Sequence, residues 1–249
     1  MVAEGGNVVR FTYTGVDDEV IPREATHILV QGKVIRRNAF QYHFNIVEVI
    51  CDEDVEKIEQ YAFYCCPSLK RVVLRGVKIV ELRAFYDCAA LEDVECDKLE
   101  IIGEGAFSWC ESLKNINLPS ARIVEQGAFA CCGALTNVKF GSKIERIDEN
   151  AFLNCHKLKR ITIPMKDGLI ANDHTFRECD DLHEVDLIEG ELHETIASLQ
   201  LEEWRNDMNE KIDSINQILP NAPAGDEDED DPGEKTQAIR RWIRSSFSD

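Results

Sequence analysis

Apolar and polar positions along this chain repeat with one pattern at intervals of 22 to 24 residues. The fixed point of the pattern is a phenylalanine preceded by alanine, or by threonine in the last copy. These phenylalanines are Phe40, Phe63, Phe85, Phe107, Phe129, Phe152 and Phe176. Each copy ends in two apolar residues with one residue between them, and this alternation predicts a strand with one buried face. A fixed period of this length predicts a solenoid, in which each coil buries its apolar face against its neighbours.

Within each copy, the pattern predicts a short strand, a turn and a longer strand. The short strand ends in an apolar residue four positions before the Ala or Thr, as at Ile102. A cysteine follows each phenylalanine by three residues from the second copy on, at Cys66, Cys88, Cys110, Cys132, Cys155 and Cys179. The first copy has His43 at this position. Because stacked coils place like residues on like residues, we expect a buried ladder of phenylalanines and a second one of cysteines.

The segment from Ile102 to Pro119 reads Ile-x-x-x-Ala-Phe-x-x-Cys-x-x-Leu-x-x-Ile-x-Leu-Pro. This motif resembles the BspA-like (Treponema-type) leucine-rich repeat, and the resemblance covers residues 33–190. It implies an α/β solenoid, a right-handed stack of about seven coils with a parallel sheet. The helical C-terminal part is also similar to expanded sets of such proteins in unicellular algae, which implies a binding module. The departures at His43, Ala171 and Thr175 fall in terminal coils, which face caps instead of another copy.

The segments outside the repeat predict two caps and a tail. Residues 1–32 contain two strand-like runs and are expected to form an N-terminal β cap, in which Phe11 and Tyr13 contact either the first coil or a partner. Residues 191–220 show a helical period with Trp204 as an anchor, and we expect an amphipathic helix that covers the last coil. The alternative is a helix reserved for a partner.

The last two segments differ sharply in composition. Residues 221–233 contain six consecutive acidic residues between Pro and Gly, which predicts a solvated linker. Residues 234–249 predict a short amphipathic helix that suits an apolar groove. Its docking residues would be Trp242, Ile243 and Phe247, and the chain's end soon after Phe247 suggests a helix cut short.

The charge balance limits the class of partner. With 28 Lys and Arg against 47 Asp and Glu, the formal net charge is -19. Such a chain repels phosphate backbones and anionic lipid surfaces, so we expect a protein partner, a basic one fitting best, and no nucleic acid. The sequence shows neither a signal-like apolar segment near Met1 nor a run long enough to span a membrane. We therefore expect a cytoplasmic protein, although the resembled family also includes surface adhesins.

The positions of the ten cysteines favour packing in the core over a reactive or metal-binding role. The six ladder cysteines lie one coil apart, whereas a zinc site gathers its four ligands at one point. Parallel side chains on adjacent coils also hold their Cβ atoms about 4.8 Å apart, beyond the usual disulfide range. Cys51 and Cys96 occupy apolar strand positions and should join the core. Cys65 and Cys131 should point outward, and a thiol-based redox sensor using them is the competing hypothesis.

No motif for catalysis, nucleotide binding or metal binding is found in the sequence. The chain is therefore predicted to be a non-catalytic protein-binding or scaffold module without a cofactor. Residues that flank the inward positions of the longer strands must point outward, since side chains alternate across a sheet. The candidate protein-binding residues on this face are Ile50, Arg71, Val73, Asn115, Asn117, Asn137, Lys139 and Arg160.

Two other interpretations of that face remain open. Opposite charges and amides one coil apart can form ion pairs and an amide ladder that stabilise the sheet without binding anything. Alternatively, the solenoid is a spacer that presents the final helix, and the tail carries the specificity.

Overall fold

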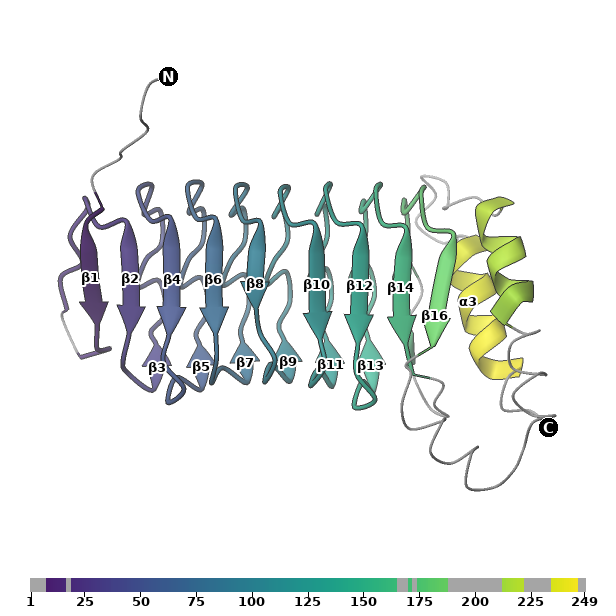
Figure 1. Cartoon of the computed structure of the whole chain (residues 1–249), viewed down its shortest axis with the longest axis horizontal. Helices are drawn as coiled ribbons and strands as arrows, with labels where there is room; N and C mark the ends of the chain where they lie inside the picture. The colour runs from purple at the N-terminus through teal and green to yellow at the C-terminus, as the bar shows by residue number, and fades with distance from the viewer. Residues whose placement is uncertain are drawn as a thin grey trace, which may run out of the picture.

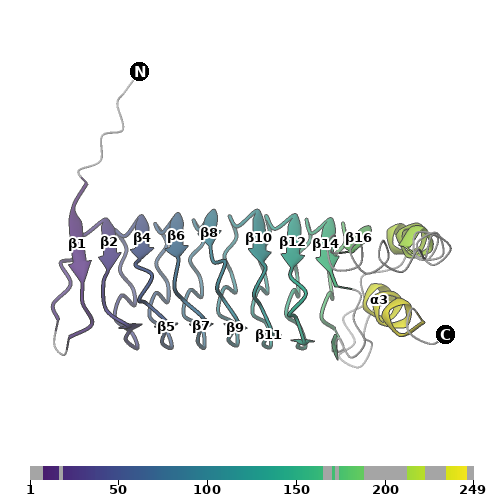
Figure 2. The ribbon, with the colours of Figure 1, turned by 60° about the horizontal axis from the view of Figure 1, so that its bottom comes forward.

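The computed structural model describes residues 8–16, 19–164, 170–171, 174–187, 212–221 and 234–245. They form an elongated solenoid of parallel strands with helices at its C-terminal end (Figure 1). Main strands line one side and short strands line the other, as the turned view in Figure 2 shows. The predicted solenoid of stacked coils with parallel sheets is confirmed.

The main strands form two sheets, ordered β1-β2-β4-β6-β8 and β10-β12-β14-β16. Their bounds are β1 (Arg10–Tyr13), β2 (His27–Val30), β4 (Glu48–Cys51), β6 (Arg71–Leu74), β8 (Asp93–Glu95), β10 (Asn115–Leu118), β12 (Asn137–Phe140), β14 (Arg160–Ile163) and β16 (Glu184–Leu187). Neighbouring strands pair in the register of the repeat, so that Val49 lies beside Val72. The repeat period therefore fixes which side chains are neighbours along the solenoid.

The short strands form one uninterrupted 7-stranded parallel sheet. They are β3 (Val34–Ile35), β5 (Lys57–Ile58), β7 (Ile79–Val80), β9 (Ile101–Ile102), β11 (Ile123–Val124), β13 (Arg146–Ile147) and β15 (Ile170–Ala171). The turn that contains the Ala-Phe pair connects each short strand to the next main strand. Each coil thus buries its apolar side chains between its main strand, its short strand and its turns.

The phenylalanines form a continuous stack along the core. Consecutive rings from Phe40 to Phe176 are stacked within 11° of parallel, with centroids 4.8 to 5.7 Å apart. All seven rings are buried. At the N-terminal end, the buried ring of Tyr13 meets Phe40 edge-on with centroids 5.0 Å apart, so this tyrosine of the cap completes the stack.

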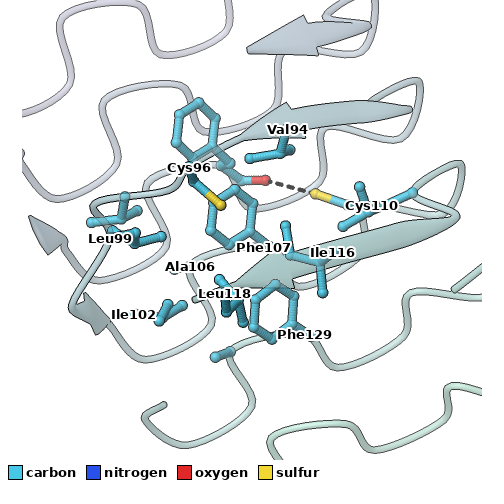
Figure 3. Packing of buried hydrophobic residues seen from close by; sticks show 14 of the residues in the cluster. Val94, Cys96, Leu99, Ile102, Ala106, Phe107, Cys110, Ile116, Leu118 and Phe129 are labelled. Carbon is cyan, nitrogen blue, oxygen red and sulfur yellow. Dashed lines mark hydrogen bonds between the residues drawn. The ribbon is translucent and has the colours of Figure 1, made fainter. Parts of the chain in front are cut away.

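Each buried ladder cysteine donates a hydrogen bond from its thiol to the phenylalanine carbonyl of the preceding coil, across 3.1 to 3.3 Å. Figure 3 shows this bond for Cys110, drawn dashed, inside the cluster around Phe107. The cysteines are thus small core residues that also satisfy a buried carbonyl oxygen. The same logic explains His43, whose longer side chain places Nε2 2.9 Å from the carbonyl oxygen of Pro22 in the cap.

The main sheet is interrupted between β8 and β10, where Figure 1 shows a wider spacing than between the other main strands. After β12, Gly141 donates its N–H to the carbonyl of Leu118. Pro119, at the matching place after β10, has no N–H to donate, but this does not by itself explain the break, since Pro164 stands at the same place after β14 and β14 pairs with β12. Across the break, the thiol of Cys96 donates to the carbonyl of Asn117 at 3.4 Å. The repeat continues through this break because the sheet of short strands is unbroken.

At the C-terminal end, helical residues cover the last main strand. Residues 212–218 are α-helical and continue into the 3-10 helix η1 (Leu219–Asn221), and α3 (Glu234–Ser245) lies beside them (Figure 2). The Asn216 amide pairs with the backbone of Val185 in β16, accepting from its N–H at 2.9 Å and donating to its carbonyl at 3.4 Å. Ile215 and Leu219 are buried in the hydrophobic cluster. Of the predicted helix and its anchor, residues 191–211 with Trp204 lie outside the described residues, as does the acidic linker from 222 on.

Candidate protein-binding face

The outer face of the main sheets carries two columns of side chains that do not serve the core. In the register of β10, β12 and β14, Asn115, Asn137 and Arg160 form one column. Asn117, Lys139 and Thr162 form the other. We call this surface the main face. Its two ends and its centre differ in how many of their polar groups already form ion pairs or hydrogen bonds within the chain.

At the N-terminal end of the main face, Arg71 is held by three carboxylates. Its guanidinium lies 3.0 Å from both Asp93 and Glu48, and it also pairs with Glu95. The hydrogen bonds that Arg71 donates to Asp93, Glu48 and Glu95 raise its pKa. The arginine thus has its donors occupied within the solenoid, as expected of a lateral ion pair that stabilises the sheet.

The prediction that Val73 offers an exposed apolar surface is wrong. Its side chain is only 1% exposed, and its neighbour Ile50 is partly buried. Val73 lies between Ile50 and Glu95 in the register of the sheet. The ion pair from Arg71, two residues earlier on the same face, reaches Glu95 and therefore borders Val73. Alternation along a strand predicts which way a side chain points, but not whether a long neighbouring side chain covers it.

At the C-terminal end, Arg160 is also engaged by acids of the next coil. Its guanidinium lies 2.7 Å from Glu184 and 3.4 Å from Asp186. The hydrogen bond with Glu184 raises the pKa of Arg160. Both arginines among the candidate residues are therefore parts of ion-pair networks on a solvated surface, which contribute little to stability individually.

The centre of the main face consists of exposed amides and one lysine. Asn137 donates to the side-chain oxygen of Asn115 at 2.7 Å, and Thr136 supports the pair from the edge of the strand. This is the amide pair that the stabilising interpretation predicts. Asn117 and Lys139, paired in register next to it, are exposed. Within the described part of the chain, neither of their side chains makes a hydrogen bond or ion pair.

The tail residues are placed only in part. Trp242 is 8% exposed and belongs to the same hydrophobic cluster as Ile239 of its helix. Its indole is thus already covered within the chain. The side chain of Ile243 and all of Phe247 lie outside the described residues, so their candidate docking role stays a prediction.

The two outward cysteines lack the environment of a reactive thiol. Burial, together with a hydrogen bond that Cys65 donates to Asp87 at 3.4 Å, raises the pKa of Cys65 to about 11. Burial also raises the pKa of Cys131. A redox sensor needs a stabilised thiolate, which requires the opposite shift. All ten cysteines are free thiols in the structure.

Two features of the described residues bear on other classes of function. No group of three or more His, Cys, Asp or Glu side chains there could hold a metal ion. No helix in the same part of the chain is both long and apolar enough to cross a bilayer.

A surface feature that the sequence reasoning missed lies on the turns of the first three coils. Tyr64 and Tyr86 stack with centroids 5.1 Å apart, and Tyr42 and Tyr61 meet Tyr64 edge-on at 5.6 and 5.7 Å. We call these four residues the tyrosine patch. A signal was present in the sequence, because a tyrosine directly follows the repeated phenylalanine in two successive copies.

The family model of the BspA type leucine-rich repeat region (6 copies) matches residues 33–159 and 78–199. The chain belongs to this family. The matched residues include all seven stacked phenylalanines, from Phe40 to Phe176. A comparison with curated proteins gives no match.

Solved structures with the same fold are bacterial leucine-rich repeat proteins. The T. pallidum leucine-rich repeat protein is 25% identical, with a TM-score of 0.51, and the match covers 71% of this chain and 73% of that one. A leucine-rich repeat protein from Bacteroides ovatus is 24% identical, with a TM-score of 0.50, covering 68% of this chain. The latter match spans 47% of the Bacteroides protein, about half its length. These likenesses support the solenoid fold.

Proposed function

We propose that this chain is a non-catalytic protein-binding or scaffold module that recognises its partner at the centre of the main face. The observation that carries the proposal is the contrast along that face. Arg71 and Arg160 are occupied by neighbouring carboxylates, whereas Asn117 and Lys139 are exposed and make no hydrogen bond or ion pair within the described part of the chain.

Membership in a leucine-rich repeat family supports this function, because stacked coils present an extended preformed surface. Because the backbone of that surface is already ordered, binding costs little backbone entropy. Most of the affinity then comes from a few residues. The net charge of -19 favours a partner that carries basic groups around the surface with which it contacts the centre of the main face. The free, buried cysteines suit a reducing compartment such as the cytoplasm, which we propose as its location.

Pull-down from native extract tests the proposal, with the unmodified chain and two charge variants as baits. The variant N117E/K139E changes the formal charge by -3 at the centre. The variant S142E/K143E makes the same charge change in the turn after β12 and serves as the matched control. We expect the N117E/K139E variant to lose a partner that the unmodified chain and the control both retain.

Truncation after Pro220 separates the face from the tail. A partner retained by the truncated chain supports recognition by the solenoid. A partner that is lost on truncation but retained by N117E/K139E would contradict the proposal and assign recognition to the C-terminal helix.

A further inference from the structure

Two of the four residues of the tyrosine patch lie at left-handed positions of the turns. Tyr42 and Tyr61 have φ angles of 58° and 59°, in the left-handed region. The same two turn positions have a positive φ in every coil, and elsewhere in the stack they also carry Cys65, Arg83, Asp87, Trp109, Cys131, His174 and Glu178. The left-handed backbone is thus a feature of the repeat. What is particular to the first three coils is the cluster of tyrosine rings, of which Tyr42 is 52% exposed.

Two arginines lie over rings of the patch. The guanidinium carbon of Arg37 is 5.9 Å from the ring centroid of Tyr61, and that of Arg83 is 5.5 Å from Tyr86. Neither guanidinium forms an ion pair with a carboxylate of the described residues, in contrast to Arg71 and its three acids. A guanidinium stacked on an aromatic ring keeps its N–H edge free for a planar, bidentate acceptor.

Two carboxylates beside the patch are already engaged within the chain. Asp87 accepts a hydrogen bond from the Cys65 thiol, and Glu59 accepts one from the backbone N–H of Arg37 at 2.8 Å. The guanidinium groups of Arg37 and Arg83 are therefore left to pair with an acidic ligand. Tyrosine and arginine are also the residues that most often dominate the energy of protein interfaces.

The spacing of the two arginines selects a ligand geometry. Arg37 belongs to the first coil and Arg83 to the third, so they lie roughly 10 Å apart along the axis if coils are about 4.8 Å apart. A polyproline II segment advances about 3.1 Å per residue, and carboxylates three residues apart on one side of it would span about 9.3 Å. Proline rings between them would face the tyrosines.

We propose that the tyrosine patch binds an extended, proline-rich acidic peptide, with Arg37 and Arg83 pairing with carboxylates three residues apart. This site lies on the turns, away from Asn117 and Lys139, and does not depend on the function proposed for the main face.

Fluorescence anisotropy tests the proposal with the full chain and a labelled peptide, Ala-Pro-Glu-Pro-Pro-Glu-Pro-Ala. We expect saturable binding that weakens at least about ten-fold in the R37Q/R83Q variant. The matched control R10Q/R75Q removes two other exposed arginines and should bind like the unmodified chain. Replacing both glutamates of the peptide by glutamine should abolish binding, and moving them to adjacent positions should weaken it.

A second variant separates binding from folding. Asn suits the left-handed position of Tyr42, so Y42N should leave the melting temperature unchanged or raised while weakening the peptide complex. No saturable binding by the unmodified chain, or equal binding by R37Q/R83Q and its control, would overturn the proposal. So would preferential binding of an arginine-rich peptide, or self-association of the chain that R37Q/R83Q abolishes, since either assigns the patch a different occupant.

Discussion

The thiol of Cys110 donates a hydrogen bond to the carbonyl oxygen of Phe85, 3.3 Å away in the preceding coil. Both groups are buried. Replacing Cys110 by alanine removes the donor and leaves the carbonyl of Phe85 with one partner fewer, which should lower the free energy of unfolding by about 1 to 3 kcal/mol. C110S retains a donor and should lose less. Urea denaturation followed by circular dichroism measures both.

The control for this series is C131A. Cys131 is only partly buried, and its thiol does not belong to the ladder. C131A should therefore change stability much less than C110A. Equal stability of C110A and the unmodified chain would show that the thiol hydrogen bonds contribute nothing.

Gly105 has a φ of 59°, where an added Cβ is disfavoured and would come within 3.2 Å of the Arg83 side chain. We expect G105A to lower the free energy of unfolding by about 1 kcal/mol or more. Gly133 is the matched control, because it has no positive φ and its added Cβ would meet nothing within 4 Å. G133A should be neutral or slightly stabilising. If both variants had the same stability, the left-handed backbone at Gly105 would not matter.

Alkaline pH should destabilise the solenoid through its buried thiols. Burial raises the pKa of Cys51, Cys96 and Cys155 to about 12, above the value of about 9 from which they are shifted. A group whose pKa is higher in the folded state stabilises it fully below the unfolded pKa, and this contribution is lost as pH rises toward the folded pKa. Each such thiol should reduce stability by about 1.4 kcal/mol per pH unit above 9.

The measurement is the urea midpoint between pH 7.5 and 10.5 with reductant present. The midpoint should fall steadily above pH 9, and replacing Cys96 by valine should make the slope shallower. A midpoint that stays constant up to pH 10.5 would contradict the burial of these thiols.

Asn216 closes the open edge of the last main strand by pairing with both backbone groups of Val185. N216A should leave this N–H and carbonyl without their partners and reduce stability by about 1 to 3 kcal/mol. The exposed edge should also promote aggregation. S214A, at an exposed position of the same helix, is the control. Light scattering and thermal unfolding of the two variants should differ clearly, and similar behaviour would mean that the edge needs no such cap.

Much of the fold could be predicted from the sequence because the repeat constrains it twice. The period sets the coil, and the apolar positions within each copy set which side chains face inward. Phe107 and Cys110 could therefore be placed in the core without coordinates. Pattern alone could not reveal that the thiol of Cys110 has a specific acceptor, since that depends on the backbone of another coil.

The exposure and contacts of the surface side chains were harder to predict, because they depend on neighbouring side chains and not on the repeat. Val73 has the alternation of an exposed residue, yet Arg71 and Glu95 form an ion pair beside it. The interruption of the main sheet between β8 and β10 could not be predicted either, because Pro119 has a counterpart in Pro164 after β14, and β14 still pairs with β12. The tyrosine patch emerges only when turns that are 22 residues or more apart are stacked.

The central claim is that the main face is the surface that a protein partner covers. Hydrogen–deuterium exchange, with the partner recovered in the pull-down added to the full chain, tests it most directly. We expect slower exchange in β10 and β12, around Asn117 and Lys139, and no such change in the N117E/K139E variant. Protection confined to α3, or to the turns of the tyrosine patch with β10 and β12 unaffected, would contradict it.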